Sequence, residues 1–427
     1  MPIKILASAD LHLGKRSSGM RVFGDDCATR HTWQRIVDYA VRHTVDALVL
    51  AGDVIDRDNR YFEGSGALQE GFEQLRDQGV EVFMVSGNHD FDVLPQVLRN
   101  HPFDNVHLLG VDGNWRAVRF ERRGETIEFI GWSFPSRYVE INPLLQLSAL
   151  VTDPNVLRLG ILHCEVDKLD SRYAPVPFSD LQNAQVDVWV LGHIHKPVAF
   201  SGTKPIRYPG SAQSLSAKET GAHGGVLLTL DGSRVEVETL CFSSCRFEGL
   251  IVDTSAVDSE EALRLLVENE LTNAANSKLV DLADVNYWVF EVHLTGENSR
   301  GKEIRDWAEP LKTGYDVRLA TGTRTLVREV TAEIRPAVEN LEALAAENSP
   351  AGVLAQCILA LRNGTSTPLL DRIIRQWESR FQSVNNAGTY QPLQEVWQRQ
   401  GNPRHPKAFI ERECSRLLGE LLYPSNR

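Results

Sequence analysis

Short apolar runs alternate with longer amphipathic stretches through the first half of this 427-residue chain, an order that is typical of an α/β fold. The runs predicted to be strands are Lys4–Ser8, Ala47–Ala51, Glu81–Ser86, Glu128–Trp132, Leu157–His163, Val186–Leu191, Gly225–Leu230 and Val235–Leu240. The chain is too long for a single compact core, so two or three domains are expected. A domain boundary is predicted near Ser243–Glu248.

After that boundary the pattern predicts a smaller α/β domain. Phe247–Val252 is predicted to be a strand, and Trp288–Leu294 alternates with the period of a half-buried strand. Asp258 and Glu261 resemble a capping box that opens a helix through Glu270. We therefore expect a main domain at 1–242, a capping α/β domain at 247–332 and a helical C-terminal region at 333–427.

Two amphipathic stretches dominate the C-terminal region. Thr367 and Pro368 form a start signal for the first helix. The apolar stripe of this helix consists of Leu370, Ile373, Ile374, Trp377 and Phe381, and that of a last helix at about 407–422 consists of Ile410, Cys414, Leu417, Leu418 and Leu421. Core packing explains each stripe taken alone, and the alternative is a docking face for a partner helix.

Composition and charge limit the cellular compartment and the binding partners that we expect for the protein. No apolar run is long enough to span a bilayer, and the N-terminal run leads directly into Asp10 and His12, as a core strand does and a secretory signal does not. Six cysteines are too sparse for a disulfide framework, so a cytoplasmic protein without a membrane partner is expected. The formal net charge of -12 repels polyphosphate, so a nucleic-acid role must depend on bound metals, a local basic surface or a partner.

Five apolar runs each end in side chains that can bind a metal ion. These side chains are Asp10 and His12 in KILASADLH, Asp53 in DALVLAGD, Asn88, His89 and Asp90 in VFMVSGNHD, His163 in LGILH, and His193 and His195 in VWVLGHIH. The loops beyond the C-terminal ends of strands are where α/β proteins build their sites. The polar residues at the ends of these five runs are therefore predicted to form one cluster.

The residue types in this cluster suit two divalent ions that bind phosphate. Carboxylate, amide and imidazole ligands favour manganese, iron or zinc over calcium or a thiolate-bound zinc. A carboxylate shared between two ions holds them about 4 Å apart, the separation that in-line phosphoryl displacement uses. Gly52, Gly87 and Gly192 directly precede ligands and permit sharp turns there. Asp-x-His or Gly-Asp alone arises by chance, whereas the complete ordered set is specific.

The ordered set ADLH, GDVID, GNHD, LH and GHIH resembles the calcineurin-like metallophosphoesterase superfamily. This resemblance implies an α/β fold in which a sandwich of two β-sheets is flanked by helices. It implies that one metal is held by Asp10, His12, Asp53 and His195, and a second metal by Asp53, Asn88, His163 and His193, with Asp53 as the bridge. It also implies two catalytic residues: His89, which would face the phosphate, and Asp90, which would orient His89. Mn²⁺ is the expected cofactor, with Fe²⁺ and Zn²⁺ as alternatives.

The segment IRYPGSAQSLSAKETGAHGGVLLTL is similar to DNA-repair exonucleases of the SbcD class, and within that class to the YhaO-type proteins. This narrower resemblance implies a metallophosphoesterase catalytic domain followed by a capping domain. DNA is then the implied substrate, and a coiled-coil, SMC-like ATPase is the implied partner. The implied function is a DNA exonuclease or endonuclease subunit that processes DNA ends during repair.

Three functions are left open by the sequence. They are a DNA nuclease, a small-molecule phosphodiesterase or phosphatase on the same scaffold, and a binding subunit with a vestigial metal site. The complete ligand set argues against the third function, and the long C-terminal extension favours the first over the second. Arg57 and Arg137 are candidate contacts to the substrate phosphate. The oligomeric state stays open, with a homodimer as one alternative.

Overall fold

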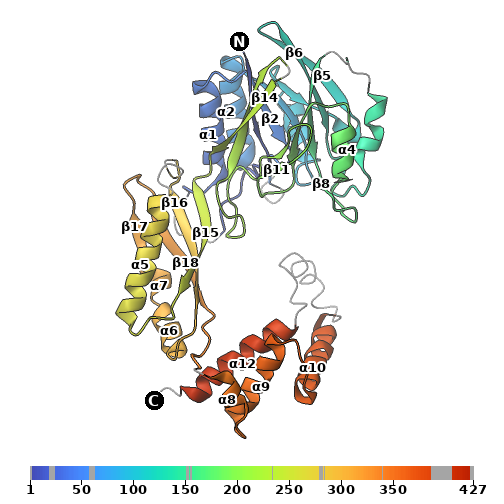
Figure 1. Ribbon diagram of the computed structural model, residues 1–427. Coiled ribbons are helices and arrows are strands. Elements are labelled where there is room, and N and C mark those ends of the chain that lie inside the picture. The colour runs from blue at the N-terminus through green and yellow to red at the C-terminus, as the bar shows by residue number, and fades with distance from the viewer. Residues whose placement is uncertain are drawn as a thin grey trace. The chain divides into compact units, whose positions relative to one another are not determined.

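The computed structural model describes residues 2–18, 25–56, 63–150, 153, 156–232, 234–277, 282, 284–338, 340–385 and 406–423. The chain forms two compact units (Figure 1). The first unit comprises Met1–Glu248, Lys278–Val289 and Val317–Leu326, and the second comprises Gly249–Ser277, Phe290–Asp316 and Val327–Arg427.

Two six-stranded sheets make up most of the first unit. The first sheet has the order β14-β13-β1-β2-β3-β4, with bounds Arg234–Cys241, Gly224–Asp231, Ile3–Ser8, Ala47–Ala51, Glu81–Val85 and Val106–Leu108. The second sheet has the order β11-β12-β10-β7-β6-β5, with bounds Val198–Phe200, Ile206–Tyr208, Val188–Gly192, Leu157–His163, Glu125–Trp132 and Arg116–Arg122. Strands β1 to β4 run parallel to one another, as do β6, β7 and β10.

The two sheets share a core, and helices cover their outer faces. Val49 and Phe83 pack with Ile161 of the second sheet, whereas Leu48 and Met84 belong to a second core on the other face of the first sheet. Helices α1 (Thr29–Arg42) and α2 (Glu63–Asp77) contribute to that second core (Figure 1). Strands that are buried on both faces have continuous apolar sequences, and for this reason they could be predicted from the sequence. The predicted two-sheet sandwich flanked by helices is confirmed.

Every predicted strand of the first half is present, with bounds that differ by a few residues. The sequence missed β4, β5, β11 and β12, together with the two-residue strands β8 (Glu165–Val166) and β9 (Pro175–Val176). Three of these strands have only three residues, and β5 is largely half-exposed or exposed, so none produces an apolar run.

A four-stranded sheet follows in the second half of the chain, in the order β15-β16-β18-β17. Its strands are Cys245–Asp253, Tyr287–Thr295, Arg324–Ala332 and Asp316–Arg318. In β16, Phe290 and Val292 are buried and His293 is exposed, so the predicted alternation is present from Phe290 onward. It is absent at the start of the strand, where Val289 is buried as well. Helix α5 (Glu260–Ser277) is longer than predicted. Ser259, and not Asp258, caps it, because the Ser259 hydroxyl accepts a bond from the Ala262 amide at 3.3 Å.

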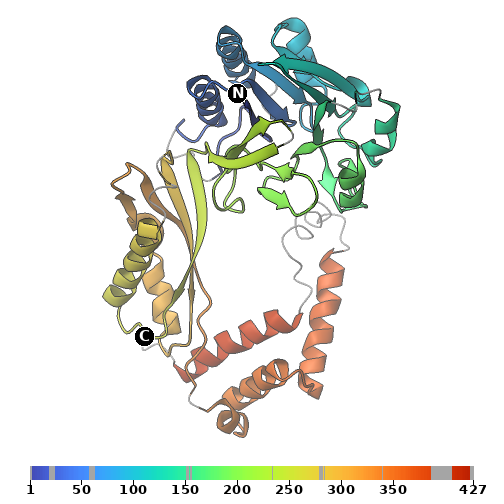
Figure 2. The same cartoon turned by 45° about the horizontal axis from the view of Figure 1, so that its top comes forward.

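The other helices among the described residues of the second unit are α6 (Gly301–Ala308), α7 (Leu311–Gly314), α8 (Leu341–Ala345), α9 (Pro350–Arg362), α10 (Pro368–Asn385) and α12 (Pro406–Leu422). The last four form the orange and red part of the chain in Figure 2. The predicted start of α10 is confirmed, since the Thr367 hydroxyl accepts a bond from the Leu370 amide at 3.2 Å. No helix in the described ranges is both long enough and apolar enough to cross a membrane.

The apolar stripe of α12 is divided between core and surface. Ile410, Cys414 and Leu418 are buried in a cluster with α9, whereas Leu417 and Leu421 are 41% and 50% exposed. The α10 stripe also contributes to this cluster, with Leu370 fully buried and Ile373 and Ile374 partly buried. The stripes therefore build a helical core and leave part of α12 uncovered.

Candidate metal centre

The predicted ligands come together because their strands are parallel. Strands β1, β2 and β3 of the first sheet end just before Asp10, Asp53 and Asn88. In the second sheet β7 ends at His163, and β10 ends just before His193. The carboxyl ends of parallel strands meet at one edge of a sheet, and the shared core aligns the two edges.

The backbone is strained where it presents these ligands. Asp10, His12, Asp53 and His193 have φ values of 49°, 46°, 49° and 97°, in the left-handed region that side chains other than glycine rarely adopt. Such strain persists only where the surrounding structure enforces it, and it concentrates at functional sites.

Two glycines are required by close approach. A Cβ atom on Gly87 would overlap the Asp53 carboxylate, and one on Gly192 would overlap the carbonyl oxygen of Ala51. Both glycines thus let neighbouring loops approach closely enough for the ligands to converge.

One group of candidate ligands consists of Asp10, His12 and His195, whose ligand atoms lie within 4.8 Å of one another. The Nε2 atoms of His12 and His195 are 3.2 Å apart. The amide of His193 donates to both oxygens of the Asp10 carboxylate at 3.1 Å, which holds this carboxylate in place. Two imidazole nitrogens and a carboxylate that converge in this way fit a divalent cation.

A second group surrounds the Asn88 side chain. Its Oδ1 atom lies 3.1 Å from His163 Nε2 and 3.3 Å from His193 Nδ1. The Nδ1 atom of His163 lies 3.0 Å from the carbonyl oxygen of Ala51, which orients the opposite ring nitrogen toward the cluster. Amide oxygen and imidazole nitrogen are again suitable ligands for a divalent ion.

Asp53 lies between the two groups. Its Oδ2 atom is 3.4 Å from His163 Nε2 and 3.9 Å from His12 Nε2, while its Oδ1 atom accepts a bond from the His89 amide at 2.8 Å. One carboxylate oxygen therefore faces both groups, as a bridging ligand must.

The charges of this cluster depend on one another. Burial disfavours the ionised form of Asp53, but His163 and His12 outweigh burial and hold the pKa of Asp53 well below its usual range. Burial also lowers the pKa of His163, but Asp53 and Asp10 favour the cation and raise that pKa to about 9. For Asp10, burial dominates and raises the pKa. A bound cation would replace the imidazolium as the partner of these carboxylates.

The model of the Calcineurin-like phosphoesterase family matches residues 3–197, a segment that contains all the clustered ligands. This part of the chain belongs to that family. The protein is accordingly a metal-dependent phosphoesterase.

Curated relatives and solved structures extend the comparison. The uncharacterized metallophosphoesterase YhaO of Bacillus subtilis is 28% identical over 276 residues, which cover 62% of this chain and 67% of that protein. The DNA double-strand break repair protein Mre11 of Archaeoglobus fulgidus is 28% identical over 238 residues, covering 51% of this chain and 52% of that protein. A dimetal phosphatase structure from Danio rerio has 16% identity and a TM-score of 0.36, covering 56% of this chain and 96% of that one. The matches thus span between about half and two thirds of the curated relatives.

Two carboxylates that the sequence did not single out support the histidines of this phosphoesterase. Asp56 Oδ1 lies 3.1 Å from His12 Nδ1, and Glu219 Oε1 lies 3.1 Å from His195 Nδ1. Although burial raises it, the pKa of Glu219 is lowered to about 2 by the bond to His195. A carboxylate on the far ring nitrogen fixes the orientation of a ligating histidine and increases its basicity. Each has a sequence signal, since Asp56 ends the GDVID motif and Glu219 lies within the segment IRYPGSAQSLSAKETGAHGGVLLTL, but neither signal names the histidine that the carboxylate contacts.

Asp90 has a different position from the one expected. Its carboxylate accepts bonds from the backbone amides of Gly87 at 2.7 Å, Val54 at 2.7 Å and Ile55 at 3.2 Å, and so joins the loops after β2 and β3. Burial and the charge of Asp53 raise the pKa of Asp90 to about 7. The Nδ1 atom of His89 instead lies 3.6 Å from Asp56. Asp56 thus lies beside the His89 ring at a distance longer than a hydrogen bond, and the Asp90 carboxylate is directed to the backbone.

We expect Asp56→Asn and Glu219→Gln to have different effects. Both changes should weaken metal binding by about 10- to 100-fold, the usual cost of losing an outer partner of a ligand. Only Asp56 also faces His89, so only Asp56→Asn should lower turnover further when metal is saturating. Metal titration followed by turnover at saturating metal separates the two effects. Equal turnover of the two variants would contradict the role of Asp56 beside His89.

The basic residues near the site differ in what they can do. Lys15 bonds Asp56 at 2.8 Å, so its charge is already paired. Arg137 is exposed, and its guanidinium lies 5.0 Å from the centre of the Tyr138 ring. Arg57 lies outside the described residues.

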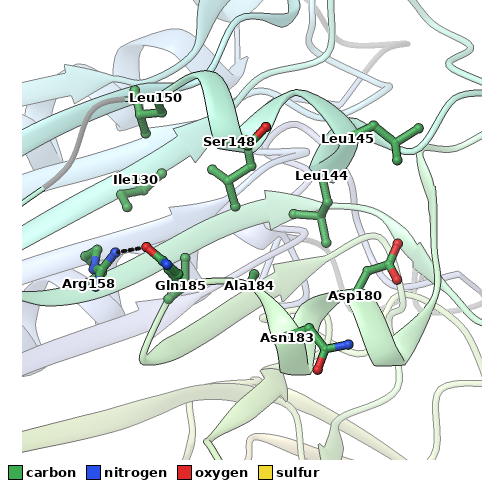
Figure 3. Close-up of a pocket in the computed structure, with 12 residues that line it drawn as sticks. Ile130, Leu144, Leu145, Ser148, Leu150, Arg158, Asp180, Asn183, Ala184 and Gln185 are labelled. Carbon is green, nitrogen blue, oxygen red and sulfur yellow. Dashed lines mark hydrogen bonds between the residues drawn. The ribbon is translucent and has the colours of Figure 1, made fainter. Parts of the chain in front are cut away.

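An apolar cavity of about 470 Å³ lies elsewhere in the phosphoesterase unit (Figure 3). Leu144 and Leu147 of the 3-10 helix η4 (Pro143–Ala149) and Ala184, which follows α4 (Phe178–Asn183), line it. Arg158, at the start of β7, also lines it, whereas β7 ends at His163 in the metal cluster. The cavity and the cluster are thus at opposite ends of one strand.

Proposed function

We propose that this protein is a dinuclear phosphodiesterase that cuts DNA, acting on DNA ends during repair. The observation that carries this proposal is the pair of ligand groups with the Asp53 carboxylate between them and the partly exposed His89 ring at their edge. The printed name of the Archaeoglobus fulgidus relative, a DNA double-strand break repair protein, supports DNA as the substrate.

The proposed ligand sets follow the two groups. Asp10, His12, Asp53 and His195 would hold one ion, and Asp53, Asn88, His163 and His193 would hold the other. Two divalent cations, which we propose to be Mn²⁺, would withdraw charge from the phosphate and make water a stronger nucleophile.

The His89 side chain is 32% exposed, so it can reach a phosphate that arrives from solvent. Its ring meets the His12 ring edge to face, with centroids 4.8 Å apart, and its backbone amide is bonded to Asp53. These contacts hold the imidazole beside the two proposed ligand groups, where one of its ring nitrogens also lies within 4.8 Å of ligand atoms of His12 and Asp56. We propose that it donates a proton to the leaving oxygen or a hydrogen bond to the charged phosphoryl group.

A substrate comparison tests the proposed function. The protein is purified with manganese and assayed on end-labelled linear DNA, on a generic phosphodiester and on a phosphomonoester. We expect cleavage of DNA and of the generic phosphodiester. Hydrolysis of the generic compounds with intact DNA would instead support a small-molecule phosphodiesterase or phosphatase.

We further propose the division into a catalytic domain at 1–242, a capping domain at 247–332 and a helical region at 333–427, with an SMC-like ATPase bound to the helical region. The exposed side chains of α12 support this partner. Phe409, Leu417 and Leu421 are 41%, 41% and 50% exposed while the rest of the stripe is buried. Full burial of one such side chain is worth roughly 1.5–3 kcal/mol.

Charged residues on α12 should therefore prevent association with the ATPase. Truncation near Thr365 would also remove Ile410 and Leu418 from the helical core, so point changes are a cleaner test. The double variant Leu417→Glu, Leu421→Glu should keep its metals and its generic phosphodiesterase activity and lose co-purification with the SMC-like ATPase of the same organism. Leu265→Glu, at a 45% exposed position on α5, is the matched control. Retained association in the double variant would contradict docking through α12.

A further inference from the structure

Two chain segments are joined at the edge of the metal cluster. The amide of Val139 donates to the carbonyl of Arg172 at 2.9 Å, and the amide of Ala174 donates back to the carbonyl of Val139 at 2.7 Å. Val139 and Ala174 are both buried. The pairing places the side chains next to Val139, at 137 and 138, beside those at 172 and 173.

Aromatic rings lead outward from the cluster along this pair of segments. The Tyr173 ring lies against the ring of the proposed ligand His193, with centroids 4.7 Å apart and planes tilted by 34°. Tyr138 follows at 5.9 Å from Tyr173, and it is 37% exposed. The rings therefore form a short row that begins at a proposed metal ligand and ends at the surface.

Two arginines flank the outer ring. The guanidinium carbons of Arg172 and Arg137 lie 4.1 Å and 5.0 Å from the centre of the Tyr138 ring. Arg172 is also 3.7 Å from Glu140, but both side chains of this pair are more than half exposed, so water screens their attraction. The positive charges of both arginines thus remain effective toward an incoming anion, in a chain whose net charge is -12.

We propose that Tyr138, Arg137 and Arg172 form a stacking site for an unpaired nucleotide next to the phosphate that is cut. This inference rests on the proposed function and specifies its substrate as single-stranded DNA or a frayed end. Tyrosine rings and guanidinium planes both stack on nucleobases, and the guanidinium charges attract the phosphates on either side. A base within a duplex is stacked on its neighbours and paired, so only an unpaired base can occupy this surface.

The row of aromatic rings also predicts the path that a bound DNA strand takes away from the metal cluster. A phosphate at the metal cluster has Tyr173 as the first ring beside it, and Tyr138 with the two guanidinium groups over its ring comes next toward the surface. No base-specific hydrogen bonding is required for such a site, so we expect tolerance of sequence together with a preference for single strands.

Binding of two strands of equal charge tests this site. One is a single-stranded oligonucleotide, and the other is a chain of the same length made of tetrahydrofuran abasic residues, which has the phosphates and lacks the bases. Binding is measured by fluorescence anisotropy in EDTA, so that cleavage is not needed for the readout, and KM is then measured with manganese. We expect the wild type to bind the strand with bases about 5- to 100-fold more tightly, the usual effect of one stacking contact.

Substitutions at Tyr138 measure how much its ring contributes to the preference for the strand with bases. Tyr138→Ala should remove the difference between the two strands, and Tyr138→Phe should retain it. Leu169→Ala, at a 72% exposed position just before the paired segment, is the matched control and should behave as wild type. Equal binding of both strands by the wild type, or an unchanged difference in Tyr138→Ala, would overturn the stacking site while leaving DNA cleavage intact. Failure to cut any DNA, with the generic phosphodiester still hydrolysed, would overturn the proposed function as well.

Discussion

Asp53→Ala is expected to lose both metal ions and to lower phosphodiesterase activity by more than about 100-fold, because it removes the carboxylate whose Oδ2 atom lies near His12 of one ligand group and His163 of the other. The remaining histidines would then lack the anion that favours a cation between them. Metal analysis of the purified variant, beside its activity on a generic phosphodiester, measures both effects.

A buried carboxylate at the other end of the same strand provides the control for Asp53. Asp46 precedes β2, is 1% exposed and pairs with Arg122 and Arg123 far from the cluster. Asp46→Asn should reduce stability and retain both metals. If Asp53→Ala still carried two ions per chain, the bridging assignment would be wrong.

His89→Ala should keep near-normal metal content and lose about 100-fold or more in turnover, the usual contribution of a general acid or an electrostatic stabiliser. The ring lies beside the ligand groups, and its removal leaves each proposed ligand in place. Turnover at saturating manganese is the measurement, with metal content determined on the same preparation.

His107 offers a matched comparison for His89. Its side chain is 30% exposed, close to the 32% of His89, and it bonds Glu81 at 2.7 Å outside the metal cluster. His107→Ala should retain full turnover. Wild-type turnover in His89→Ala would refute the catalytic role, and loss of metal in that variant would make His89 part of the metal site instead.

The strands of the α/β fold and the ligand cluster could be predicted from local pattern, whereas the two-sheet sandwich was implied by the family resemblance. A strand buried on both faces must be apolar along its length, so β1, β2, β3, β7 and β10 are visible in the sequence. The polar residues that interrupt these runs mark the strand ends, and parallel strands bring their ends to one edge. The convergence of Asp10, Asp53 and His163 therefore followed from strand order without knowledge of any distance.

Which carboxylate lies beside which histidine was decided only by the tertiary structure. Asp90 directly follows His89 in sequence, yet its carboxylate bonds to the backbone of two loops, while Asp56, from another loop, faces the His89 ring. Adjacent residues on a tight turn point in different directions, so sequence proximity does not predict which side chains meet. Glu219 shows the same limit, since it lies 24 residues after His195 in the sequence and nothing in the sequence pairs the two side chains.

The apolar stripe of α12 is partly buried and partly exposed, and this too depends on packing between distant segments. Periodicity shows that Ile410, Leu417 and Leu421 lie toward one side of a helix, but the width of the covered face depends on which neighbours pack there. The packing of α9 against α12 buries Ile410 and leaves Leu417 and Leu421 exposed. Sequence by itself thus determined the strands and the convergence of the ligands, because these depend on local apolar pattern, while the pairing of two sheets into a sandwich was implied only by the family resemblance. Tertiary structure decided which carboxylate supports which histidine and which apolar side chains stay uncovered, because those depend on contacts between distant segments.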